Sequence, residues 1–221
     1  MGSALMGLAL AGAQPAAVKS DRDALPSDDS TNRCARSASG NGITVKVCRR
    51  ADTWRTTNGV DWTQHSSGTV GLLHDVAFGN GVFVAVGNEG KLVTSSDGAA
   101  WTRRNSRTDE RLRGIAFGNG MFVAVGYEGT VITSKDGVKW SLRDSGTTAR
   151  LQRVIYEQGK FVAVGWNGMA LTSTDGKSWA ACRTGRGERL DAIAFHDGRF
   201  AASITNRVVW ISDDGTNWTA P

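Results

Sequence analysis

Hydrophobic and polar residues alternate along short segments of this chain, a pattern typical of β-strands. In the segment "VFVAV", Val82–Val86, the three valines fall on one face of an extended strand, and Phe83 and Ala85 fall on the other. The surrounding residues 73–104 contain four such runs, separated by Gly-Asn-Gly, Gly-Asn-Glu-Gly and Asp-Gly turn sequences. This stretch therefore predicts four short antiparallel strands.

The four-strand unit recurs at a constant spacing along the chain. A step of 39 residues separates the members of three series, which are Trp62, Trp101, Trp140, Trp179 and Trp218; Gly59, Gly98, Gly137, Gly176 and Gly215; and Phe83, Phe122, Phe161 and Phe200. The stretch "GNGITVKV", Gly40–Val47, aligns without a gap with "GNGVFVAV", Gly79–Val86, so the array has five units. A sheet this small cannot bury both of its faces alone, so the units must stack on one another.

The predicted fold is all-β: a five-bladed β-propeller of four-stranded antiparallel blades that occupies residues 33–221. Each unit runs from an inner to an outer strand without borrowing a strand from another unit. We therefore expect a monomeric ring, closed by packing between the first and last blades. A dimer of open arcs is the alternative.

Four of the units place an Asp-Gly turn three residues before a tryptophan, as in "TSSDGAAWT", Thr94–Thr102. Glycine accepts the positive φ of a tight turn, and aspartate can accept hydrogen bonds from nearby backbone amides. We expect the tryptophan to begin the outer strand, where its ring covers the gap between two blades. The turn aspartates are thus predicted to be structural and not catalytic; they are Asp97, Asp136, Asp175 and Asp214.

These turns resemble a shortened Asp-box, the BNR-type repeat whose usual form is Ser-x-Asp-x-Gly-x-x-Trp. Ser95, Asp97, Gly98 and Trp101 keep that order with one residue fewer between Asp and Trp. The unit "FGNGxFVAVGxxGxxxTSxDGxxW" is also similar to the repeats of bacterial propellers related to the photosystem II assembly factor family. The resemblance covers residues 40–219 and implies a propeller fold, which serves both hydrolases and scaffolds.

A likeness to sialidase-type propellers would imply three converging arginines, one in an Arg-Ile-Pro motif, with a Tyr-Glu pair and an acidic Asp. The chain has no Arg-Ile-Pro motif, and Tyr127 and Tyr156 occupy ordinary blade positions. Glu89 and Glu128 are equivalent residues of adjacent units, and such positions should lie too far apart to flank one glycosidic bond. We therefore predict no catalytic residue, and a carbohydrate-active hydrolase or a glycan-binding protein is the alternative.

Signals for metals and cofactors are absent from the sequence pattern. The three histidines, His65, His74 and His196, lack the spacing of metal ligands. The glycine pairs belong to hairpin turns and do not form a phosphate-binding loop that leads into a helix. No metal site and no cofactor is predicted.

Two cysteines flank the first Gly-Asn-Gly turn. A three-residue loop over Gly40–Gly42 makes cross-strand partners sum to 82, and Cys34 and Cys48 meet this sum. A disulfide between them would suit an exported protein, and two unpaired buried thiols are the alternative. Cys182 is left as a buried or weakly reactive thiol.

The variable segments between blades are rich in arginine. In a propeller whose innermost strand comes first, these links share one rim with the turns between the second and third strands. The links contain Arg103, Arg104, Arg107, Arg111, Arg143, Arg150, Arg183, Arg186 and Arg189. Three of these arginines recur at 39 residues just before the inner strand and should surround the mouth of the central channel; they are Arg111, Arg150 and Arg189.

The turns on the same rim present three different residues at one equivalent position, namely Asn88, Tyr127 and Trp166. Exposed aromatic residues beside arginine are typical of interaction hot spots. Ordinary solvated loops, with Glu110 and Glu188 compensating the arginines, are the alternative. We expect this rim to bind a protein or glycan ligand that carries acidic groups.

The overall charge limits the class of partner. Lys and Arg exceed Asp and Glu by 26 to 21, a net charge of +5, and acidic residues occur in every unit. Such a surface offers no continuous basic stripe, so nucleic acid is an improbable partner. The sequence predicts a non-catalytic scaffold or recognition module.

The first 32 residues differ from the array. The short apolar run "ALMGLALAGAQPAA" is followed by the polar stretch "VKSDRDALPSDDSTN". This arrangement resembles a secretory signal with a flexible leader and indicates export to the periplasm or the cell exterior. A cytoplasmic tail is the alternative. No apolar run reaches the length of about 18 residues that a membrane span needs.

Overall fold

The computed structural model describes residues 34–48, 51–184, 187–205 and 207–221. The predicted signal segment and leader, residues 1–32, lie outside this described part. Within these ranges, nineteen strands form five antiparallel sheets, in each of which neighbouring strands are consecutive in the sequence. The all-β antiparallel architecture is as predicted.

The first three sheets each have four strands. The first contains β1 (Cys34–Gly40), β2 (Ile43–Cys48), β3 (Asp52–Thr56) and β4 (Thr63–Ser66). The second contains β5 (Leu73–Gly79), β6 (Val82–Gly87), β7 (Leu92–Ser95) and β8 (Thr102–Arg103). The third contains β9 (Leu112–Gly118), β10 (Met121–Gly126), β11 (Val131–Ser134) and β12 (Ser141–Arg143), with the 3-10 turn η2 (Tyr127–Gly129) between β10 and β11.

The last two sheets follow the same order. The fourth contains β13 (Leu151–Glu157), β14 (Lys160–Gly165), β15 (Met169–Ser173) and β16 (Ala180–Arg183). The fifth contains β17 (Ala192–His196), β18 (Arg199–Ile204) and β19 (Arg207–Ser212). A single bridge between Ile211 and Thr219 stands where the other sheets have an outer strand.

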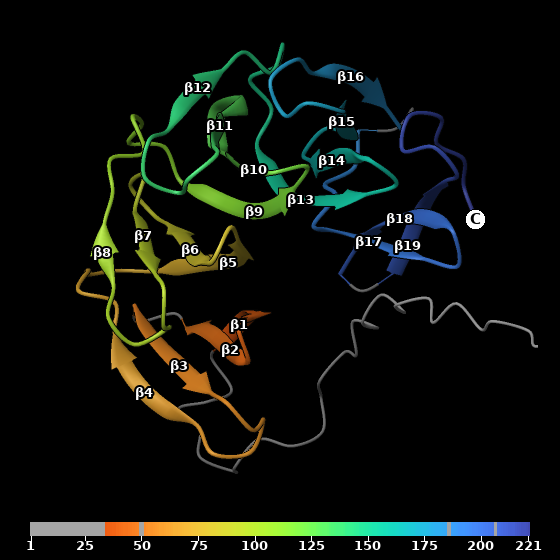
Figure 1. Ribbon diagram of the computed structural model, residues 1–221. Helices are drawn as coiled ribbons and strands as arrows, with labels where there is room; N and C mark the ends of the chain where they lie inside the picture. Colours follow the sequence, from red (N-terminus) through yellow and green to blue (C-terminus); the bar gives the residue numbers. More distant parts are fainter. Residues whose placement is uncertain (1–33, 49–50, 185–186, 206) are drawn as a thin grey trace, which may run out of the picture.

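The five sheets follow one another around a common centre, with β1, β5, β9, β13 and β17 innermost (Figure 1). Each innermost strand lies close to the next one along the chain. Within the described ranges, no strand of the fifth sheet makes a comparable contact with the first, and Figure 1 shows them as the two ends of an arc. Closure into a five-bladed ring therefore remains a prediction.

Apolar clusters fill the joint between each pair of consecutive sheets. Between the second and third sheets, Val84 and Val86 pack with Phe122 and Trp140, and Trp140 is 3% exposed. This is the gap that the tryptophan was predicted to cover. The indole N–H of Trp140 donates to the carbonyl of Gly137 at 2.9 Å, which ties the ring to its own turn.

The Asp-Gly turns are closed by side-chain hydrogen bonds. The carboxylate of Asp136 accepts from the backbone N–H groups of Val138 and Lys139 at 2.8 and 2.9 Å, and Ser134 binds both that carboxylate and the N–H of Gly137. The same bonds recur at Asp97, Asp175 and Asp214. Because these N–H groups favour the charged form, the pKa of each turn aspartate lies below its ordinary value.

The pairing of the two cysteines is as predicted, but for a different reason. The first hairpin turns on two residues, Asn41 and Gly42, so cross-strand partners sum to 83 from Gly40–Ile43 onward. A bulge between Cys34 and Arg36 then shifts the register by one and sets Cys34 opposite Cys48. The disulfide stays a prediction, because the side chain of Cys34 is outside the described part.

Candidate functional site

The predicted rim residues are fixed in place by backbone hydrogen bonds. The N–H groups of Asn88, Tyr127 and Trp166 each donate to the carbonyl of the residue that precedes the innermost strand of the same sheet. For Tyr127 this carbonyl belongs to Arg111, and for Trp166 it belongs to Arg150, both at 2.9 Å. The 39-residue repeat therefore brings each arginine beside the aromatic residue of its own unit.

Five of the six predicted rim residues form one alternating stack across three sheets. The guanidinium carbon of Arg150 lies 4.6 Å from the ring centre of Tyr127 and 4.5 Å from that of Trp166. Arg111 lies 5.1 Å from the Tyr127 ring, and Arg189 lies 5.0 Å from the Trp166 ring. All four distances are within the range of cation–π attraction. We call Arg111, Tyr127, Arg150, Trp166 and Arg189 the arginine–aromatic ladder.

The ladder carries positive charge that nearby carboxylates compensate only at one end. Arg189 pairs with Asp191 at 2.8 Å. Across the described residues, no carboxylate lies within ion-pair distance of Arg111 or Arg150. Glu188, which would compensate the arginines in the alternative of ordinary solvated loops, instead accepts a hydrogen bond from the indole of Trp210 at 3.1 Å.

The sixth predicted rim residue, Asn88, does not join the ladder. Its side-chain oxygen lies 2.6 Å from Nε2 of His74, and Nδ1 of His74 lies 3.2 Å from a guanidinium nitrogen of Arg113. Since the guanidinium can only donate, Nδ1 must accept, and Nε2 must carry a hydrogen that it donates in a hydrogen bond to the side-chain oxygen of Asn88. Arg113 also donates to Gln152 at 3.1 Å, which extends this polar row across three sheets.

Burial and neighbouring arginines disfavour a charged His74. Desolvation, with the charge of Arg113, lowers the pKa of His74 from 6.5 to about 4. Sequence reasoning missed this row because it concentrated on the links. The signal was available as polar residues at one repeated position at or just before the start of the innermost strands, His74, Arg113, Gln152 and Asp191.

Two ionisable residues, the buried Asp75 and the partly buried Arg153, lie next to this row. Asp75 is enclosed, and its carboxylate accepts from the N–H groups of Val76 and Ile115 at 3.0 and 3.1 Å. Burial raises the pKa of Asp75, while the charge of Arg153 opposes that change. Burial also lowers the pKa of Arg153 to about 10, and Arg153 donates to the carbonyl of Arg113 at 2.6 Å. These groups join the innermost strands of neighbouring sheets.

Other arginines of the links do not reach the ladder. Arg104 and Arg143 donate to Thr94 and Thr133 of their own sheets at 3.0 and 2.9 Å. Arg186 and the side chain of Arg183 lie outside the described part of the chain. The feature that distinguishes Arg111, Arg150 and Arg189 is thus their position directly before the innermost strand.

Glu89, one of the carboxylates considered for glycoside chemistry, is engaged in an ion pair at the surface. Glu89 is 80% exposed and pairs with Lys91 at 2.6 Å. Its hydrogen bond to Lys91 lowers the pKa of Glu89, whereas a general acid needs a raised pKa. Burial raises the pKa of the Cys182 thiol, which makes that residue a poor nucleophile.

Among the described residues, no group of three or more His, Cys, Asp or Glu side chains is placed to hold a metal ion. In the same part of the chain, no helix has the length and apolar character needed to span a bilayer.

Comparisons with known proteins find similarity in structure only. No protein-family model matches the chain, and no curated protein matches it. The structure of YCF48 bound to a D1 peptide superposes with a TM-score of 0.62 at 16% identity, over 85% of this chain and 66% of that chain. A chain of the nidogen–laminin complex gives a TM-score of 0.65 at 11% identity, over 85% of this chain and 80% of that chain.

The computationally designed protein Ika8 is similar as well. It gives a TM-score of 0.65 at 13% identity, over 83% of this chain and 59% of the designed chain. The fold is that of a β-propeller. The chain spans about two-thirds of the YCF48 chain and less of the designed one, and at these identities the comparisons establish the fold alone.

Proposed function

We propose that this protein is a non-catalytic recognition module that binds an acidic segment of a partner protein on the arginine–aromatic ladder. One observation carries the proposal: Arg150 is held between the rings of Tyr127 and Trp166, and the described residues supply neither a carboxylate nor a hydrogen-bond acceptor for its guanidinium. The stacked guanidinium has no anionic partner among the described residues, so it is available to bind a carboxylate.

The stacking leaves the edge of the guanidinium for a ligand. Its N–H groups lie in the plane of the guanidinium and can bind both oxygens of one carboxylate, which the compact ammonium of lysine cannot copy. The rings on either side of Arg150 limit the rotamers of a long side chain before binding. This preorganisation reduces the entropy lost when the complex forms.

The ladder suits an extended ligand better than a single small anion. Its three arginines come from the links before three consecutive sheets, so a chain that crosses these sheets could place several carboxylates in turn. Two of the similar propellers have a protein or peptide partner in their structures, namely YCF48 with a D1 peptide and nidogen with laminin. This supports a protein partner over a glycan for the present chain.

We also propose that the protein is exported, that Cys34 and Cys48 form a disulfide, and that the units are Asp-box repeats. A Cys34–Cys48 crosslink across the first hairpin would suit an oxidising compartment outside the cytoplasm. The hydrogen-bonded Asp-Gly turns support a relation to Asp-box repeats. Fractionation of cells that express the full chain would test export directly, since a cytoplasmic location would contradict it.

A labelled oligo-glutamate peptide provides the first test of binding. Fluorescence anisotropy should show saturable binding that weakens with salt, and Arg150→Lys should weaken it by about fivefold or more, or about 1 kcal/mol. Arg103→Lys, on the exposed outer strand β8, is the matched control and should bind like the parent. An Arg150→Lys variant that binds like the parent would contradict the proposal. Preference for an acidic polysaccharide over the peptide would favour a glycan partner instead.

A further inference from the structure

Each Asp-Gly turn packs directly against the preceding sheet. A Cβ added to Gly137 would lie 3.1 Å from Val84, and one added to Gly215 would lie 2.8 Å from Val162. Gly98 and Gly176 meet the preceding sheet in the same way, at 2.5 and 2.9 Å. Each of the four joints is thus closed by a turn whose glycine leaves no room for a side chain.

The first sheet presents the same kind of turn with nothing in front of it. Gly59 has a φ of 77°, close to the 72° of Gly98, yet a Cβ on Gly59 would meet no atom within 4 Å. The turn is already formed, because the side-chain oxygen of Asn58 accepts from the N–H groups of Val60 and Asp61 at 2.9 Å. We call residues 56–61 the plug turn.

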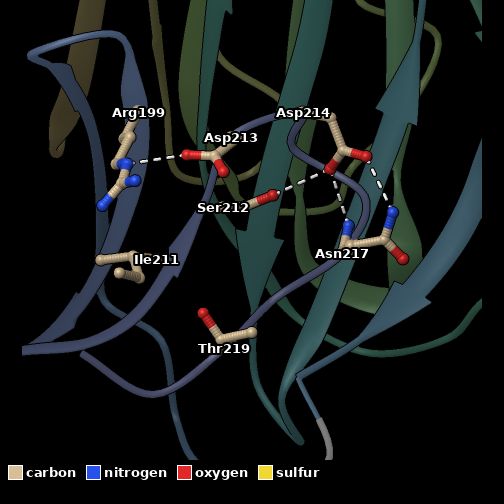
Figure 2. A pocket seen from close by; sticks show the side chains of 7 residues that line it. All are labelled: Arg199, Ile211, Ser212, Asp213, Asp214, Asn217 and Thr219. Atoms are coloured by element: carbon tan, nitrogen blue, oxygen red, sulfur yellow. Dashed lines mark hydrogen bonds and ion pairs between the residues drawn. The ribbon is translucent and has the colours of Figure 1, made fainter.

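The fifth sheet has a hollow at the place where a further turn would sit. In the joint between the second and third sheets, Gly137 is seated against Val82 and Thr94. The residues three repeats later are Arg199 and Ile211, and both line a hollow of about 350 Å³ beside Asp213 and Thr219 (Figure 2). We call this hollow the socket.

The socket also retains a donor for a backbone carbonyl. In the joint between the fourth and fifth sheets, the ammonium of Lys160 donates to the carbonyl of Asp214 at 2.8 Å. Arg199 is the equivalent of Lys160, one repeat later. It pairs with Asp213 at 2.7 Å, but the two side chains are 57% and 77% exposed, so this ion pair contributes little and can be exchanged.

The side chains of the two end faces differ from the internal ones in compensating ways. On the face of the first sheet, Lys46 stands where the next sheet has Ala85. On the face of the fifth sheet, Ala201 and Ser203 replace the valines found at 84 and 86. A larger side chain opposite two smaller ones can preserve the packed volume of a joint.

We propose that the plug turn of one copy seats in the socket of a second copy. Figure 1 shows the first and last sheets as the two ends of an arc, linked through four close-packed joints, and within the described ranges the two end sheets share no comparable joint. A second copy supplies the matching turn without opening any of these joints. The proposal is independent of what the ladder binds.

Such a joint uses two different surfaces, so association runs head to tail. One joint leaves a free plug turn at one end and a free socket at the other. Association therefore continues beyond a dimer unless the rotation closes a ring.

Two blocking variants test the joint on the full chain. Gly59→Asn adds a side chain to the plug turn while keeping a residue that tolerates positive φ. Ala201→Trp enlarges the residue that pairs with Ile211, one of the residues that line the socket, and should obstruct it. The matched controls are Gly42→Asn, whose glycine faces open space at a φ of 73°, and Ala181→Trp on the exposed part of β16.

Sedimentation velocity should show that the parent and both controls associate more as concentration rises towards about 1 mM, and that each blocking variant stays monomeric. An equimolar mixture of the two blocking variants should form a species of two chains and stop, since only one joint can form. A parent protein that stays monomeric at every concentration would overturn the proposal. It would favour closure within one chain or a different partner.

Blocking variants that still associate, or that fail to pair with each other, would also overturn it. Circular dichroism confirms folding, and Arg199→Glu, with Lys177→Glu as its control, replaces Ala201→Trp if that variant misfolds.

Discussion

The guanidinium carbon of Arg150 lies 4.5 Å from the centre of the Trp166 ring, and the backbone N–H of Trp166 donates to the carbonyl of Arg150. Backbone and side chain thus hold the same two residues together. The repeat makes this possible. In each of these units, the link that precedes the innermost strand lies beside the turn that follows the second strand. A fixed cation at the rim is the structural basis of the proposed recognition.

Removal of a joint tryptophan should destabilise the fold. Trp140→Ala should lower the free energy of unfolding by about 3–5 kcal/mol, because the ring is buried between the second and third sheets. Trp62→Ala, on the open face of the first sheet, should cost less. Urea denaturation of both variants at low protein concentration measures the difference, and equal losses would contradict the assignment of Trp140 to a joint.

The turn aspartates should tolerate asparagine but not alanine. Asp136→Ala removes the acceptor for two backbone N–H groups and should cost about 1 kcal/mol. Asp136→Asn should cost much less, because Asn58 accepts the equivalent bonds in the first sheet. Thermal melting compares the two, and an equal loss would show that the charge matters more than the hydrogen bonds.

Acidification should remove stability through His74. Because the pKa of His74 in the folded protein is about 4 against an ordinary 6.5, the unfolded chain binds this proton more readily. The stability present above pH 6.5 is therefore lost as pH falls towards about 4. Asp75 acts in the opposite direction, since burial raises its pKa and its protonation favours the folded state.

The histidine contribution can be isolated with a matched pair of variants. His74→Asn should flatten the dependence of unfolding free energy on pH between 6.5 and 4, whatever its effect at neutral pH. His196→Asn, which replaces a histidine that is 85% exposed, should leave the profile as in the parent. Identical profiles for the parent and His74→Asn would contradict this account.

The first hairpin should be crosslinked when the protein is produced in an oxidising compartment. Mass spectrometry without reduction should recover a peptide that joins Cys34 to Cys48, whose backbones pair directly. The crosslink closes a loop of 15 residues, so reduction should cost about 3 kcal/mol. Recovery of both cysteines as free thiols would contradict the prediction.

Periodicity was sufficient to predict the repeat, the strand order and the seating of Trp140, because each depends on residues that recur in every unit. It also predicted that Arg111, Arg150 and Arg189 would share one rim. The partnership of Asn88 with His74 could not be predicted, since it depends on which side chain of a neighbouring strand is within reach. The bulge beside Cys34 was missed for a similar reason, because no turn residue marks it.

The ends of the array were the least predictable part. Pattern alone shows five similar units, but it does not show how closely each turn glycine packs against a valine of the preceding sheet. Replacement of two valines of the internal faces by Ala201 and Ser203 was visible in the sequence. That these two residues lie on an exposed end face could not be predicted, because it depends on the arrangement of the five sheets as an arc.

Capture of the natural partner tests the central claim most directly. Tagged parent protein, Arg150→Lys, Trp166→Ala and the control Arg103→Lys would be used to recover binding proteins from extracts of the source cells, with partner yield and melting temperature measured for each. We predict that Arg150→Lys and Trp166→Ala each weaken capture by about 1 kcal/mol or more, with melting temperatures close to that of the parent, while Arg103→Lys captures normally. Equal capture by all four proteins would contradict recognition through the arginine–aromatic ladder.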